Sequence, residues 1–298
     1  MIDARAILPA IAMAVLLAGC GPDRTAGATG VGNPTKGMVT MALVAVDSLP
    51  AAAGVDSGPP RGVGKVSASL RNPDGSFDIR DAGGTVFTVR AGFANVGRIR
   101  IALPDSLDCS DDGDNECESG TVTFRGPWVS DLMTGSWSPD LGAVRLPVGA
   151  YRRVDIRLEA QEDSPGAGPD LARHSLIYSG TFDYQGRADR PFRIALDFDE
   201  DARFESADGF ALDTGSNAIT LSLRIAEWLA RADLTSCLDS GAIPLDESGG
   251  FVFEKDGDCE MEQDLKEALK GSGSVHGGRH DESDDGHAQD SVTAGEAH

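Results

Sequence analysis

Apolar and polar residues alternate with a period of two over much of the chain. The clearest runs are residues 99–103, 154–158, 192–198 and 219–225, in which every second residue is Ile, Leu, Val or Phe or an equivalent apolar residue. Successive side chains of a β-strand point to opposite faces, so this pattern predicts strands with one buried face.

Further strand candidates are shorter and are separated by turn sequences. Glycine and proline mark turns at residues 72–75, 147–149 and 188–191. About ten short strands with little helix predict an all-β protein, built as a sandwich or as a sheet closed on itself. The shorter candidates are residues 38–46, 77–79, 86–89, 122–124, 144–146 and 251–253.

Helix is predicted only late in the chain. Residues 226–230 predict one or two turns, and residues 259–270 predict a longer helix that ends at Gly271. In the longer helix Met261, Leu265 and Ala268 share one face, and Asp258 is placed to cap its start. Residues 271–298 are rich in glycine, serine, aspartate and histidine, so we expect a disordered tail.

The first residues have the layout of a bacterial lipoprotein signal. An apolar run that follows Arg5 ends in Leu17-Ala18-Gly19-Cys20. The run is shorter than the roughly 20 residues that a membrane-spanning helix needs. We therefore expect residues 1–19 to be a signal peptide and Cys20 to carry the lipid anchor, with an ordinary secretory signal as the alternative.

The lipidated cysteine is followed by a tether and then by the folded region. Gly21 is not aspartate, and by resemblance to enteric lipoproteins this favours the outer membrane. Residues 20–36 are small, polar and rich in glycine and proline, which predicts flexibility. Residues 37–270 form the predicted β region, which is either one sandwich or two halves divided near residues 161–174.

The net charge and the cysteines narrow the range of possible functions and partners. The formal net charge of −22 argues against nucleic acid as a partner, because phosphate binding needs a basic surface. Four cysteines remain beyond Cys20, and in an exported protein they are expected to form disulfides. Cys109 with Cys117 and Cys237 with Cys259 is the expected pairing because the partners are close in sequence, although other connectivities are open.

The loop between the first cysteine pair is a candidate calcium site. Asp108, Asp112, Asp114 and Glu116 supply closely spaced oxygen ligands around a glycine. Ser119 stands where a calcium hand has its bidentate glutamate, so the register is imperfect. The alternative is a solvated acidic loop.

Two sets of candidate catalytic residues are incomplete. Asp213-Thr214-Gly215 resembles the active-site motif of aspartic proteases, but no second copy of the motif supplies the partner carboxylate. The same residues would also make a turn between two strands. His174 has no identifiable serine or cysteine partner, so hydrolase chemistry lacks support.

Aromatic residues offer a weaker candidate for glycan binding. These side chains either form a platform on which sugars stack or pack into the core. The residues are Trp128, Trp137, Trp228, Tyr151, Tyr178 and Tyr184.

Residues 124–132 and 144–156 carry a family resemblance. The second stretch reads Val-Arg-Leu-Pro-Val-Gly-Ala-Tyr-Arg-Arg-Val-Asp-Ile, and together they are similar to bacterial lipoproteins of a domain-of-unknown-function family. Ser130-Asp131-Leu132 departs slightly from the Val-Asp-Leu of that family. The resemblance implies an immunoglobulin- or prealbumin-like β-sandwich, in which the proline and glycine shape a hairpin, and it implies no catalytic residues.

Together these features predict a lipid-anchored protein of the cell envelope with a binding or structural role. Its expected partners are the bilayer, through the acyl anchor, and an envelope protein or glycan. Calcium-assisted adhesion is a narrower form of this hypothesis. The alternative is an envelope hydrolase with carboxylates that the sequence does not identify.

Overall fold

The structure is a computed structural model that describes part of the chain. The described residues are 35–46, 71–104, 116–118, 120–161, 171–254, 259, 261–271 and 273–279. They belong to one compact unit that spans Asn33–His298. The predicted signal peptide, Cys20 and nearly all of the predicted tether lie outside the described residues.

The strands join in one 14-stranded sheet, which confirms the all-β prediction. Its main path runs β13-β10-β9-β3-β8-β11-β14-β12-β1-β7, with β2 and β5 paired to β3, and β4 and β6 paired to β5. The strands are β1 (Lys36–Val46), β2 (Phe77–Arg80), β3 (Val86–Ala102), β4 (Glu116–Glu118), β5 (Thr121–Asp131), β6 (Trp137–Ser138), β7 (Val144–Pro147), β8 (Gly149–Leu158), β9 (Leu176–Tyr184), β10 (Arg187–Leu196), β11 (Glu200–Leu212), β12 (Ser216–Arg224), β13 (Phe251–Phe253) and β14 (Gly273–Arg279).

Strand β3 connects the two parts of the sheet because it changes partners along its length. Its first half pairs with β2 and β9, and its second half pairs with β5 and β8. The register shifts near Gly97, where the change of partners falls. The strands before and after residues 162–170 therefore share one sheet, since β9 pairs with β3 and β11 pairs with β8.

The second part of the sheet curves until β1 and β5 lie side by side. The backbone N–H of Ala45 donates to the carbonyl oxygen of Leu132 at 2.8 Å. The hydroxyl of Ser130 donates to the carbonyl oxygen of Leu43 at 3.1 Å. The curved sheet encloses the main core, and the residues between the buried positions of the alternating pattern point to its other face.

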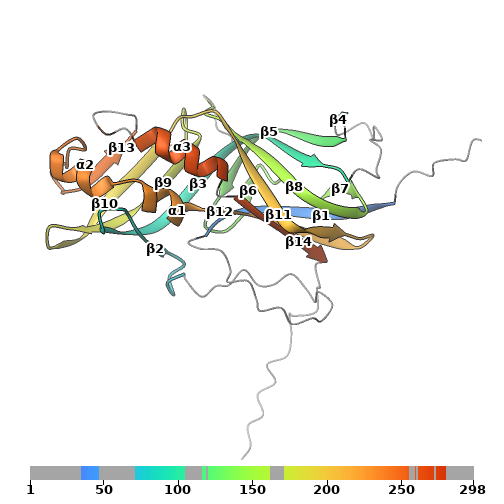
Figure 1. The fold of residues 1–298 in the computed structure, drawn as a ribbon, viewed down its shortest axis with the longest axis horizontal. Helices are drawn as coiled ribbons and strands as arrows, with labels where there is room; N and C mark the ends of the chain where they lie inside the picture. The colour runs from blue at the N-terminus through green and yellow to red at the C-terminus, as the bar shows by residue number, and fades with distance from the viewer. Residues whose placement is uncertain are drawn as a thin grey trace, which may run out of the picture. The chain divides into compact units, whose positions relative to one another are not determined.

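Three helices cover the other part of the sheet, near β9 and β10 (Figure 1). They are α1 (Ile225–Arg231), α2 (Leu234–Ser240) and α3 (Met261–Gly271). The first and third match the predicted helices, and α3 buries Met261, Leu265 and Ala268 as expected. The predicted disulfide between Cys237 and Cys259 is confirmed, and it ties α2 to the residues just before α3. No helix among the described residues is long and apolar enough to cross a membrane.

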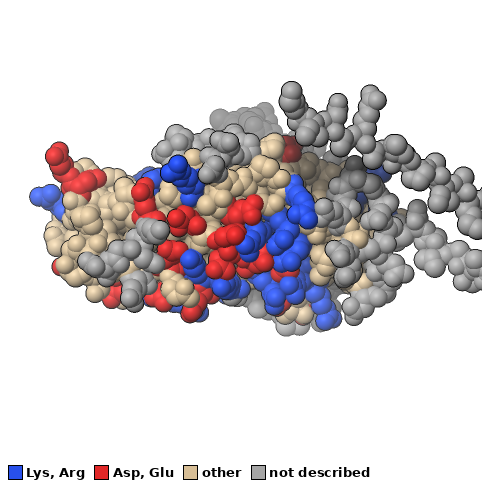
Figure 2. Space-filling model, turned by 90° about the horizontal axis from the view of Figure 1, so that it is seen from above, with Lys and Arg blue, Asp and Glu red and all other residues tan. Residues whose placement is uncertain are grey.

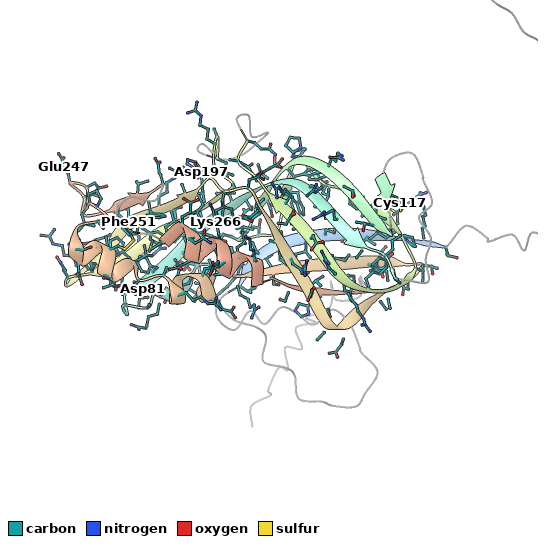
Figure 3. All side chains as sticks on the ribbon, turned by 45° about the horizontal axis from the view of Figure 1, so that its top comes forward. Asp81, Cys117, Asp197, Glu247, Phe251 and Lys266 are labelled. Carbon is teal, nitrogen blue, oxygen red and sulfur yellow. A yellow bond between two sulfur atoms is a disulfide. The ribbon has the colours of Figure 1, made fainter. Side chains whose placement is uncertain are left out.

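Aromatic packing fills the core beneath these helices. Phe87, Phe182, Phe192 and Phe251 lie with ring centroids 5.1–6.3 Å apart and are almost fully buried. Phe251 lies at this end of the molecule and Cys117 at the opposite end (Figure 3).

The structure differs from the predicted disordered tail of residues 271–298, because residues 273–279 form strand β14. Residues 280–298 lie outside the described residues. Strand β14 lies between β11 and β12, pairing with β12 over seven residues and with β11 over two. Val275 is fully buried, and the glycines allow close approach, since a Cβ at Gly277 would lie 2.5 Å from the Phe210 ring. Low apolar content predicted disorder, but backbone pairing on both sides compensates for the few side chains that the strand buries.

The Leu-Pro-x-Gly-x-Tyr segment also differs from the hairpin that the resemblance implies. Strand β7 pairs with β1, whereas β8 pairs with β3 and β11. Pro147 and Gly149 thus form a corner between strands that are not paired with each other. The Tyr151 hydroxyl closes this corner by donating to the carbonyl oxygen of Pro147 at 2.6 Å.

Candidate functional site

The outward face of β5, β3, β8 and β11 carries a regular array of charged residues. Alternation along each strand sends Ile99, Val154, Ile156 and Phe204 into the core, each fully buried, and sends their neighbours outward. We call the outward charged residues the charged lattice. Across β5, β3, β8 and β11, one row holds Arg125, Arg98, Arg157 and Asp201; the next holds Thr123, Arg100, Asp155 and Arg203; and Arg153 faces Glu205 on β8 and β11.

Three arginines of the charged lattice converge on Asp201. Nη2 of Arg98 lies 3.3 Å from one carboxylate oxygen, and Nη2 of Arg100 lies 3.2 Å from the other. Nη1 of Arg157 lies 3.7 Å from that second oxygen, and its Nη2 lies 2.5 Å from Asp199. The two arginines of β3 therefore reach across β8 to share one carboxylate on β11.

Asp155 organises the adjoining part of the charged lattice. Its carboxylate accepts from Nε and Nη2 of Arg153 at 2.7–3.0 Å, a two-pronged pairing, and lies 3.6 Å from Nε of Arg203. Asp155 is largely buried, with 11% of its side chain exposed. Arg153 thus has its planar donors engaged, which is the strong form of an arginine–carboxylate pair.

These contacts shift the pKa values of two arginines on this face. The hydrogen bond to Asp155 raises the pKa of Arg153 above its ordinary value. Burial lowers the pKa of Arg157, but the hydrogen bond to Asp199 and the charges of Asp201 and Glu159 raise it overall. These guanidinium groups remain charged at any pH at which the protein is folded.

Arg98 and Arg100 are engaged far less completely than Arg153. Within the described part of the chain each makes one long hydrogen bond, to Asp201, although a guanidinium has five N–H donors. Nε of Arg98 is buried and has no hydrogen-bond partner among the described residues. About a third of each side chain is exposed, 30% for Arg98 and 33% for Arg100. The pair therefore offers unused donors for an oxyanion that arrives from solvent.

Acidic and basic side chains gather next to one another on one face of the molecule (Figure 2). Like charges directly opposite one another in a sheet are unfavourable, yet Arg98 faces both Arg125 and Arg157. Shared carboxylates offset this repulsion within the protein, and a bound anion would reduce it further.

The predicted calcium ligands lie mainly outside the described residues. Asp108, Asp112 and Asp114 are not described, and of Glu116 only the backbone is, where it opens β4 opposite Thr123. Cys117 is disulfide-bonded, and its partner, predicted as Cys109, lies outside the described part of the chain. Calcium binding by this loop stays a prediction.

The protease-like motif forms the turn between β11 and β12. The backbone N–H of Gly215 donates to the Asp213 carboxylate at 2.7 Å. The buried Asn217 side chain donates to the carbonyl oxygens of Asp213, Gly215 and Met38. These contacts support the interpretation of the motif as a turn between two strands.

The aromatic candidates pack into the core. Trp228, Tyr151, Tyr178 and Tyr184 are at most 6% exposed. Trp137 is half-buried and donates from Nε1 to the carbonyl oxygen of Met41 at 2.7 Å. The rows of the charged lattice contain no aromatic residue, so a sugar-stacking platform does not coincide with this face.

His174 serves the structure through its backbone, since its carbonyl oxygen accepts from the buried Asn95 side chain at 2.6 Å. Its Nδ1 is buried without a hydrogen-bond partner among the described residues. No nucleophile is paired with it there.

No family model, no curated protein and no solved structure matches this chain. The assignment of a function therefore rests on the residues themselves. The segments of the charged lattice were not singled out from the sequence, because only strand pairing brings them together. They are Arg98-x-Arg100, Arg153-x-Asp155-x-Arg157 and Asp201-x-Arg203-x-Glu205.

Proposed function

We propose that this protein is a lipid-anchored binding protein of the bacterial cell envelope. In this proposal acylated Cys20 holds the chain to the outer membrane, and the all-β unit is related to immunoglobulin- or prealbumin-like sandwiches. The role is the capture of a partner, without catalysis. The binding surface is the charged lattice on β3, β8 and β11.

The observation that carries this proposal is the incomplete engagement of Arg98 and Arg100. A purely structural ion-pair network gains most when each guanidinium pairs bidentately, as Arg153 does with Asp155. Arg98 and Arg100 instead share one carboxylate through single bonds and stay accessible. The disulfide between Cys237 and Cys259 supports an exported location, because disulfides persist in oxidising compartments.

Metabolic labelling of the full chain tests the anchor. Expressed in a bacterium supplied with radioactive palmitate, the protein is expected to incorporate label and to sediment with outer membranes. The Cys20→Ser variant should do neither, because it lacks the thiol that carries the lipid. Label in the variant equal to that in the wild type, or a wild-type protein free of label, would refute the anchored form of the function.

A further inference from the structure

We propose that the charged lattice binds an extended acidic polypeptide segment whose carboxylates lie on alternate residues. This inference rests on the proposed function, since it names the partner chemistry of the same face. Asp201 is the resident competitor of that segment, because its carboxylate occupies the guanidinium groups that the segment would engage.

Arg98 and Arg100 are suited to bind a carboxylate group. A guanidinium presents planar N–H donors that match the two oxygens of a carboxylate. The structure already places a carboxylate between Arg98 and Arg100, with oxygen distances of 3.3 and 3.2 Å. A carboxylate therefore fits this position sterically, and the donors that have no partner among the described residues remain for another.

The spacing of Arg98 and Arg100 matches that of alternate residues in an extended peptide. Arg98 and Arg100 are two residues apart on β3 and point to the same side, so they repeat at about 6.7 Å. An extended peptide alongside has the same repeat at alternate residues. The chain shows such a presentation itself, because Arg157 contacts both Asp199 and Asp201, which are also two residues apart.

A glycan and an anionic membrane fit the charged lattice less well than an acidic peptide does. Glycan recognition commonly uses aromatic stacking, and the lattice rows contain no aromatic residue. An extended anionic surface such as a membrane would meet a chain with a formal net charge of −22. At about 0.1 M ionic strength a short acidic segment at Arg98 and Arg100 meets mainly the charges of the lattice itself, because charges beyond about 10 Å are screened.

The test is a direct binding measurement on the full chain in detergent. The probe is a fluorescent twelve-residue peptide of alternating Glu and Ser, followed by anisotropy at about 0.1 M ionic strength. A peptide of the same composition with its glutamates in one block tests the spacing. Arg98→Gln with Arg100→Gln should weaken binding of the alternating peptide by about tenfold or more, since two charge-assisted pairs are lost.

A matched control separates this effect from charge alone. Arg145→Gln with Arg187→Gln removes two exposed arginines outside the charged lattice and should change the affinity less than about twofold. Asp201→Asn should tighten binding by about three- to tenfold, because it removes the resident carboxylate. A purely structural lattice would not produce that gain.

The outcomes separate the inference from the proposed function. Equal binding by wild type and Arg98→Gln with Arg100→Gln, or no gain in a folded Asp201→Asn protein, overturns the inference. Tighter binding of polyuronate or of anionic vesicles than of the alternating peptide, lost in the same arginine variant, also overturns it but leaves the face as a binding surface. Failure of palmitate labelling refutes the anchor and has no bearing on this measurement.

Discussion

Arg100 on β3 donates a hydrogen bond of 3.2 Å to Asp201 on β11, across the intervening strand β8. Arg98 reaches the other oxygen of the same carboxylate at 3.3 Å. These contacts connect strands that no backbone ladder joins, and among the described residues they leave most guanidinium donors of both arginines without a partner. The face is therefore ordered by its own charges, and in our proposal its exposed guanidinium groups engage a further anion.

The disulfide between Cys237 and Cys259 should contribute substantially to stability. It closes a loop with a sequence separation of 22, for which chain entropy predicts about 3 kcal/mol. Replacing both cysteines by serine should lower the free energy of unfolding by about that amount in denaturant titrations. Replacement by alanine should cost the same if the cross-link is the cause, whereas unchanged unfolding midpoints would contradict the prediction.

Strand β14 should be sensitive at its glycines. A Cβ at Gly277 would lie 2.5 Å from the Phe210 ring, so Gly277→Ala should destabilise the fold by about 1–3 kcal/mol through overpacking. His276 is exposed on the same strand, and His276→Ala should stay within about 0.5 kcal/mol of the wild type. Thermal unfolding of the two variants distinguishes a packed strand from a free tail, for which both changes would be silent.

Alkaline pH should unfold the protein as its tyrosines ionise. Burial raises the pKa of Tyr151 and of Tyr178, and the hydrogen bond to Asp239 raises the pKa of Tyr184. Each raised pKa stabilises the fold below the unfolded value of about 10, and this contribution is lost as pH rises through the folded pKa. These are the 3 tyrosines of the chain, so tyrosinate absorbance should appear together with loss of near-ultraviolet circular dichroism. Ionisation near pH 10 with the fold intact would contradict this account.

The acidic loop should respond to calcium if the sequence-based hypothesis holds. Calcium at millimolar concentration is expected to raise the melting temperature of the full chain, and chelator should reverse the rise. Asp112→Ala with Asp114→Ala should abolish the response, while Asp208→Ala with Glu247→Ala, exposed acids elsewhere, should leave it intact. A melting temperature that does not depend on calcium would remove the metal hypothesis.

Local periodicity predicted the secondary structure better than it predicted the pairing. The alternation at residues 154–158 and 219–225 and the apolar face of Met261, Leu265 and Ala268 identify elements that the structure contains. Strands β9 and β11 and helix α2 were missed. Glycine interrupts the alternation of β9 at Gly180 and of β11 at Gly209, and α2 buries only Leu234 and Leu238. Strand β14 was missed because its order depends on backbone groups of β11 and β12 and hardly on its own side chains.

The arrangement of the charged lattice cannot be predicted from one sequence. The outward position of Arg100 follows from the predicted alternation, but β11, which carries Asp201, was not among the predicted strands. The proximity of the two residues depends on a topology in which β8 lies between β3 and β11. Register then decides that Arg98 faces Arg157 and Arg100 faces Asp155. A shift of one residue would turn these side chains toward the core, so the site exists only once the sheet is assembled.

Site-specific crosslinking in intact cells tests the binding face most directly. A photoreactive amino acid at Thr123, which pairs with Arg100 on the lattice face, should form an adduct with a partner protein. The adduct should disappear with Arg98→Gln and Arg100→Gln, and the same photoreactive residue at Thr220 in β12 should yield none. An adduct at Thr123 that survives the arginine changes, or equal adducts at both positions, would contradict the claim that the charged lattice is the binding surface.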